Sequence, residues 1–193
     1  LIDHFDASKG EITSLVASAL SKADDGELFA EYRQSESLMF DNGRLKTASY
    51  NEDRGFGLRA VAGEAVGYAH SGEMSVAALK RAGDAVGAVQ SGYSGSYAAA
   101  PMGTNLKLYG DENPLDGPMF EEKVKLLQEI DAYLRAKDPK VQQVTVSLAA
   151  NYQQVEILRA DGHFVRDVRP LVRLNVSVVA GDGVKQETGS YGA

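Results

Sequence analysis

The densest run of charged side chains lies on a segment that otherwise reads as a strand. It is Arg166-Asp167-Val168-Arg169-Pro170-Leu171-Val172-Arg173. One interpretation is a solvated face with cross-strand ion pairs. The other is a polar wall that receives a substrate chain or contacts a partner subunit. We take Asp167, Arg169 and Arg173 as candidate channel or interface residues.

The remaining chemistry-bearing residues do not form a recognisable site. His4, His70 and His163 have neither a metal-ligand spacing nor a clear nucleophile beside them. Gly55-Phe56-Gly57 lacks the third glycine and the Gly-Lys-Ser/Thr of a phosphate loop, so we expect these glycines to permit a bulge or a close backbone approach. With no cysteine, the sequence has no thiolate zinc site, disulfide or catalytic thiol.

Composition limits the classes of function. The chain has 193 residues, 44% of them hydrophobic, and a net charge of −7. That length predicts one globular domain, and the acidic balance argues against nucleic-acid binding. No apolar run reaches the length of a membrane span, and Leu1 to Phe5 does not resemble a signal peptide. We expect a cytoplasmic location, and we expect the chain to continue beyond its last residue.

Apolar periodicity predicts three helices, at about Glu11–Ala23, Met74–Val89 and Pro118–Lys137. Ser75 is the expected N-cap of the second helix. Between the second and third helices, residues 91–117 show no periodicity and are rich in glycine. We expect this loop to act as a mobile gate.

Alternation and turn residues predict two sets of strands. We expect Pro170 to interrupt pairing within the second set. The predicted segments are 27–36, 44–50, 54–61 and 65–70, then 141–148, 152–160, 163–169, 171–180 and 184–188. The order is helix, four strands, helix, loop, helix, then four or five strands. Tight turns make neighbouring strands antiparallel, so the predicted fold class is α+β with long antiparallel sheet(s).

Two long strands of the second set carry uncharged polar side chains on one face. Exposed antiparallel surfaces more often carry Lys and Glu, so this face suits half-buried packing against another domain. The residues are Gln143, Thr145, Ser147, Asn175 and Ser177.

Several segments resemble the TldD branch of the TldD/PmbA family, and the resemblance extends over nearly the whole chain. Its most specific part is the Asp-Val-Arg-Pro-Leu-Val-Arg segment. Arg59, in the first segment, joins the candidate channel or interface residues. The segments are Arg54–Glu64, Val66–Ala69, Leu108-Tyr109, Asn113–Leu115, Asp161-Gly162, Asp167–Val178 and Gly189–Gly192.

The resemblance implies a cytoplasmic zinc metalloprotease that cleaves unfolded or extended peptides as a homodimer or with a TldE/PmbA-type partner. It implies a zinc held by a His-Glu-x-x-x-His helix and a distant Cys, in a C-terminal domain that this chain lacks. Residues 1–193 are then a non-catalytic N-terminal domain that shapes the peptide channel and the dimer contact. We expect it to hold no cofactor or metal and to contact neither membrane nor nucleic acid. The alternative is a PmbA/TldE-like partner or interaction module.

Overall fold

The computed structural model describes residues 1–97, 99, 103 and 107–193. It has three α-helices, two short 3₁₀ helices and a six-stranded antiparallel sheet, which confirms the predicted α+β class. The sheet order is β3-β2-β1-β4-β5-β6. The helices are η1 (Ile2–His4), α1 (Lys9–Ala19), α2 (Val76–Gly87), η2 (Ala88–Gln90) and α3 (Phe120–Arg135). The strands are β1 (Asp25–Asp41), β2 (Arg44–Ala62), β3 (Ala65–Ser71), β4 (Val141–Arg159), β5 (Phe164–Gly181) and β6 (Gln186–Gly192).

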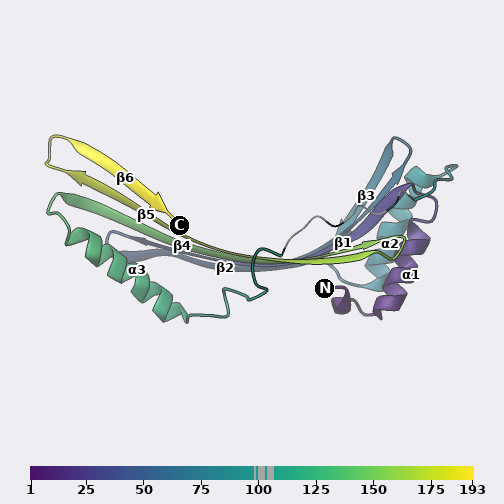
Figure 1. The fold of residues 1–193 in the computed structure, drawn as a ribbon, viewed down its shortest axis with the longest axis horizontal. Coiled ribbons are helices and arrows are strands. Elements are labelled where there is room, and N and C mark those ends of the chain that lie inside the picture. Colours follow the sequence, from purple (N-terminus) through teal and green to yellow (C-terminus); the bar gives the residue numbers. More distant parts are fainter. Residues whose placement is uncertain (98, 100–102, 104–106) are drawn as a thin grey trace. The chain divides into compact units, whose positions relative to one another are not determined.

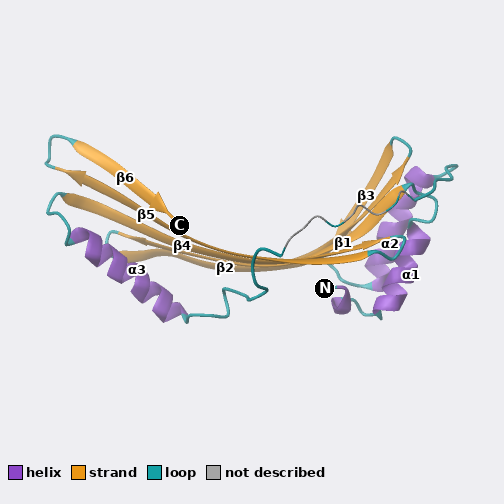
Figure 2. Ribbon diagram, viewed as in Figure 1, coloured by secondary structure: helices purple, strands orange, loops and turns teal. Residues whose placement is uncertain are grey.

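The chain forms two compact units, and four of its strands contribute residues to both. Unit 1 comprises residues 1–33, 53–108 and 153–168; unit 2 comprises 34–52, 109–152 and 169–193. Each unit packs helices against one face of its strands (Figures 1 and 2).

In unit 1, α1 and α2 supply the helical side of the core. Ile12 and Val16 of α1 and Leu79 and Val86 of α2 are almost wholly buried. They pack with strand residues such as Leu58. Ser75 is the N-cap of α2, as predicted, because its side chain accepts the Ala78 N–H.

In unit 2, α3 covers one face of the strands. Leu127 packs with Val144 and Val146 of β4 and with Leu38 and Phe40 of β1. The helix begins at Phe120, two residues after the predicted first-turn proline. Its N-cap is Met119, whose N–H donates to the Glu122 carboxylate at 2.8 Å.

The strands in the structure are longer and fewer than the predicted ones. Residues 44–50 and 54–61 are one strand, β2, and residues 141–148 and 152–160 are one strand, β4. The expected interruption at Pro170 is wrong, because β5 runs unbroken through it. β6 pairs with β5 over Asn175–Gly181, which leaves Pro170 outside that ladder, at a position where a missing N–H is tolerated.

Candidate functional site

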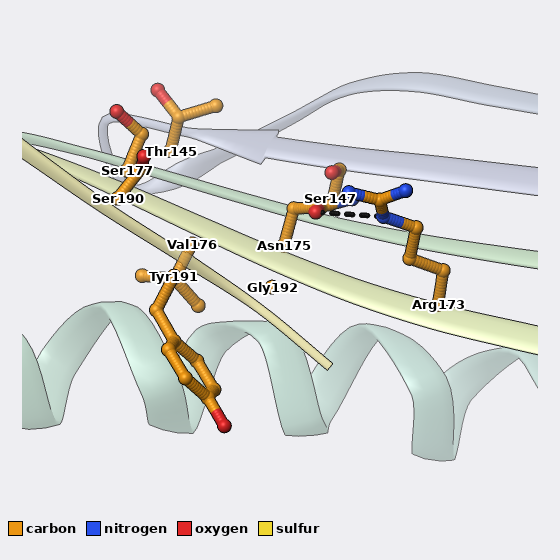
Figure 3. A pocket seen from close by; sticks show the side chains of 9 residues that line it. All are labelled: Thr145, Ser147, Arg173, Asn175, Val176, Ser177, Ser190, Tyr191 and Gly192. Atoms are coloured by element: carbon orange, nitrogen blue, oxygen red, sulfur yellow. Dashed lines mark hydrogen bonds between the residues drawn. The ribbon is translucent and has the colours of Figure 1, made fainter.

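The strands of unit 2 present an uncovered polar face on the side away from α3. Leu174, Val176 and Val178 of β5 pack toward the core with α3. Alternation therefore turns Arg173, Asn175 and Ser177 to the opposite side. Figure 3 shows Ser177 and Asn175 on that side of the strands, and Val176 on the helix side. Val172, which precedes Leu174 in the same alternating set, is exposed.

This face is hollowed by a cavity of about 230 Å³ near the edge of the sheet. Three strands build it: β4, β5 and the edge strand β6. Its lining residues are drawn in Figure 3: Thr145, Ser147, Arg173, Asn175, Val176, Ser177, Ser190, Tyr191 and Gly192. The polar face predicted from the sequence thus forms one wall of a shallow cavity.

Arg173 and Asn175 form the charged end of the cavity. The Arg173 Nε–H donates to Asn175 Oδ1 at 3.0 Å, the contact dashed in Figure 3. Gly192 is the cross-strand partner of Asn175. A Cβ at Gly192 would lie 2.6 Å from Asn175 Oδ1 and 3.5 Å from an Arg173 Nη atom. Because Gly192 has no side chain, Asn175 and Arg173 can occupy this space.

Asp41 supports the other end of the polar face. Its Oδ1 accepts the Thr145 hydroxyl at 2.8 Å and the Gln143 amide N–H at 3.0 Å. These two hydrogen bonds hold the pKa of Asp41 below its usual value, and the bond from Gln143 has the larger effect. Thr145 is thereby fixed in orientation by a carboxylate that stays ionised at neutral pH.

The four candidate residues are divided between the two units. Arg173 lines the cavity of unit 2, and Arg169, also in unit 2, is exposed on β5. Asp167 is half-buried and belongs to unit 1, as does Arg59. Only Arg173 is therefore placed in the lining of the unit 2 cavity.

Arg59 belongs to an ion-pair network. Its guanidinium contacts both carboxylate oxygens of Glu27, at 2.7 and 2.9 Å, and lies 3.1 Å from Asp25. Asp25 also pairs with Arg159 at 2.7 Å. The hydrogen bond to Glu27 is the main reason that the pKa of Arg59 is raised. The Arg59 guanidinium is thus paired with two carboxylates of β1.

Another cavity, of about 340 Å³, lies in unit 1 and includes the first residues of the Arg54–Glu64 segment. It contains Tyr68 and His70, whose rings stack with centroids 5.8 Å apart. A Cβ at Gly57 would meet the Tyr68 hydroxyl oxygen at 2.6 Å, and one at Gly55 would meet the Ser71 carbonyl oxygen at 2.7 Å. Close approach, one of the two roles expected of these glycines, is what the structure shows. The lining residues are Phe29, Glu31, Arg33, Asp53, Arg54, Gly55, Phe56, Gly57, Tyr68, His70, Ser71 and Gly72.

The first part of the predicted gate, residues 91–97, is fastened to unit 1. The Tyr93 hydroxyl donates to Asp24, which also accepts the Gly63 N–H at 2.8 Å. The Tyr97 hydroxyl donates to the Leu20 carbonyl. Residues 98, 100–102 and 104–106 of the gate lie outside the described residues, and the gate stays a prediction.

Sequence reasoning missed the contribution of β6. The predicted strand was 184–188, whereas β6 runs Gln186–Gly192 and brings Ser190 and Gly192 to the cavity. The sequence of β6 has little alternation of apolar and polar residues. Its place beside the cavity follows only from its register with β5. The described polar side chains of the unit 2 lining carry hydroxyl, amide and guanidinium groups, which can form hydrogen bonds and bind an anion.

Comparison with protein families gives two matches along the chain. Residues 26–89 match the model of the PmbA/TldA metallopeptidase domain 1, and residues 113–193 match that of the PmbA/TldA metallopeptidase central domain. The metalloprotease TldD homolog of Haemophilus influenzae is 36% identical over 173 residues. That alignment covers 88% of this chain and 36% of the relative, so the chain spans about a third of the relative's length.

Solved structures share the fold at low sequence identity. A candidate modulator of DNA gyrase from Bacteroides thetaiotaomicron superposes with a TM-score of 0.73 at 11% identity, covering 95% of this chain and 44% of that one. TldE from Thermococcus kodakarensis gives 0.70 at 13% identity, covering 93% and 41%. Within the described part of the chain, every helix is too short or too polar to cross a bilayer.

Proposed function

Because this chain belongs to the PmbA/TldD family, we propose that it serves as the non-catalytic N-terminal domain of a TldD-like zinc metalloprotease. In this role it shapes the channel for an unfolded or extended peptide and contributes to the contact with a second subunit. The proposed location is the cytoplasm. The observation that carries the proposal is the uncovered polar face of unit 2, hollowed beside the edge strand β6.

The chemistry of this face fits binding. An extended peptide presents N–H and C=O groups along its length, and hydroxyl and amide side chains can satisfy both. Thr145, Ser147 and Asn175 supply such groups from adjacent strands. An edge strand such as β6 also offers unpaired main-chain groups to which an extended peptide can add.

The residues described here do not fit a zinc site. In the part of the chain with assigned positions, no three His, Cys, Asp or Glu side chains come together in a metal-binding group. The proposed contribution of these residues is therefore to hold and orient the peptide, and none of them is assigned a catalytic step.

The test is peptide cleavage by a protein that carries this chain together with the zinc-binding part implied by the family. Arg173→Ala is expected to lower cleavage of an unfolded peptide and to leave the zinc content unchanged. Arg44→Ala is the matched control, because Arg44 is an exposed arginine of unit 2 outside the cavity. Unchanged cleavage in Arg173→Ala would favour the solvated-face interpretation.

A second candidate function is that of a TldE/PmbA-like partner subunit. It is favoured by the likeness of the fold to TldE from Thermococcus kodakarensis. The two candidates differ in one measurement: a TldD-like protein supplies the zinc on mixing with a partner, whereas a TldE/PmbA-like one restores cleavage without bringing zinc of its own.

A further inference from the structure

We propose that the unit 2 cavity recognises a carboxylate group of the bound peptide, with Arg173 as its charged contact. The inference rests on the proposed peptide-binding function and specifies the chemistry of its ligand. The carboxylate is either an Asp or Glu side chain or the C-terminal carboxylate of the peptide. The cavity, at about 230 Å³, is small for a whole ligand and suits one side chain or chain end.

The first argument is the charge of the lining. Among the residues that the structure describes, the lining contains one guanidinium and no carboxylate, although the whole chain has 27 acidic and only 20 basic residues. Most other arginines with assigned side-chain contacts are paired with acids, as Arg59, Arg81 and Arg135 are. Among the described residues, the polar side chain that contacts Arg173 is the neutral amide of Asn175. A carboxylate ligand would supply the anion that this guanidinium does not meet within the cavity.

The second argument is the orientation of the guanidinium. Asn175 Oδ1 accepts the Nε–H, and this bond uses one of the five N–H donors of the guanidinium. Arginine binds carboxylates through two parallel N–H donors, and a fixed guanidinium loses less entropy on binding. Gly192 maintains this arrangement, because a Cβ there would lie 2.6 Å from Asn175 Oδ1.

The third argument is the set of neutral donors around the charge. The side chains of Ser147, Ser177 and Ser190 each carry a hydroxyl that can donate to a carboxylate oxygen. Figure 3 shows these side chains on the same side of the strands as Asn175. Charge-assisted hydrogen bonds are about twice as strong as neutral ones, so this lining favours an anion over an amide.

The test is a titration of the ¹⁵N-labelled 193-residue chain followed by NMR. Three alanine-based tetrapeptides serve as probes: one with an internal Asp and both ends blocked, one with a free C-terminal carboxylate, and one neutral with both ends blocked. We expect at least one acidic probe to shift the Arg173 Nε–H and Asn175 amide signals, with a dissociation constant on the order of millimolar or tighter. The neutral probe should bind at least about tenfold more weakly. The acidic probe that binds identifies the source of the carboxylate.

Variants of the cavity make the test specific. Arg173→Gln should weaken the acidic probe about tenfold or more while leaving the neutral probe unchanged. Arg173→Lys should recover part of the loss, since it restores the charge without the fork. Gly192→Ala should weaken binding by displacing Asn175, and Arg44→Gln should change nothing. A dispersed amide spectrum shows that each variant is folded.

Two results would overturn the proposal. If neutral and acidic probes bind equally, with no effect of Arg173→Gln, the cavity does not read a carboxylate, while peptide binding itself stands. If no probe shifts these signals at millimolar concentration, carboxylate recognition also fails. The proposed role in cleavage is judged separately by the Arg173→Ala assay of zinc content and activity.

Discussion

Lys123 Nζ of α3 lies 2.7 Å from Glu36 Oε1 of β1, and both side chains are largely withdrawn from solvent, at 8% and 16% exposed. The pair fastens the single helix of unit 2 to its strands. Lys123 precedes Leu127 of the apolar cluster by four residues on α3, and Glu36 precedes Leu38 of the same cluster by two residues on β1.

Glu36→Gln is expected to destabilise the protein by about 3 kcal/mol, because it leaves the ammonium of Lys123 poorly solvated and without its anion. Urea unfolding followed by the circular dichroism of the helix measures the loss. Glu129→Gln is the control, since Glu129 and Lys125 are exposed and 3.8 Å apart. That substitution should cost less than about 0.5 kcal/mol. Equal effects of the two variants would contradict a structural role for the buried pair.

Alanine substitution should separate the two glycines of the Arg54–Glu64 hairpin. At Gly55 a Cβ would meet the main-chain oxygen of Ser71, which cannot move without disturbing the strand pair, so a loss of about 2 kcal/mol is expected. At Gly57 it would meet the ring of Tyr68, which is 65% exposed and can rotate away. The expected change there is below about 1 kcal/mol.

Thermal unfolding of both variants measures the difference. In the Tyr68→Ala background, Gly57→Ala should no longer lower the free energy of unfolding, whereas Gly55→Ala should lower it as before. The reverse order of stability would show that the close approach to Ser71 is not the constraint at Gly55.

Acid should weaken the attachment of residue 93 to Asp24. The hydroxyl of Tyr93, chiefly, and the Gly63 N–H hold the pKa of Asp24 below its usual value. A depressed folded-state pKa contributes stability that is present above the unfolded value of about 4 and is lost as the pH falls through the folded value. Stability measured from neutral pH downward should fall more steeply in the wild type than in Asp24→Asn. Identical profiles would contradict the contribution of Asp24.

Tyr97 should ionise later than an ordinary tyrosine. Burial is the main reason that its pKa is raised to about 12, and its hydroxyl donates to the Leu20 carbonyl. Because the folded pKa lies above the unfolded value of about 10, its contribution to stability is present below pH 10 and disappears as the pH rises toward 12. Tyrosinate absorbance of the wild type minus that of Tyr97→Phe should show this late step. A step near pH 10 in the difference would place Tyr97 in solvent.

Local structure was predictable where one or two residues determine the backbone conformation. Asn-Gly and Asp-Gly pairs are typical of tight turns, and at Asn42-Gly43 and Asp161-Gly162 the residues Asn42, Gly43 and Gly162 have positive φ angles of 53°, 78° and 84°. The N-cap at Ser75 was equally readable. The helical stripes around Ile12 and Leu127 follow from spacing alone, because one face must be buried.

Features that depend on pairing between distant strands were not predictable. The strand ends expected after Tyr50 and Arg169 do not occur, because neighbouring strands continue the sheet past residues of low strand propensity. The cavity could not be predicted without the strand register that places Asn175 opposite Gly192. Arg173 was a candidate from its charge density, but only this register shows why it faces a hollow while Arg59 faces two carboxylates.

The division of each unit among three chain segments has a consequence for biosynthesis. Unit 1 is incomplete until residues 153–168 have been made, although it begins at Leu1. The first strands of unit 1 therefore stay partly unpaired until most of the chain has been translated. Such non-local pairing slows folding and exposes strand edges to association with other chains. A ribosome-bound nascent chain should thus acquire protease resistance in one late step rather than in two successive ones.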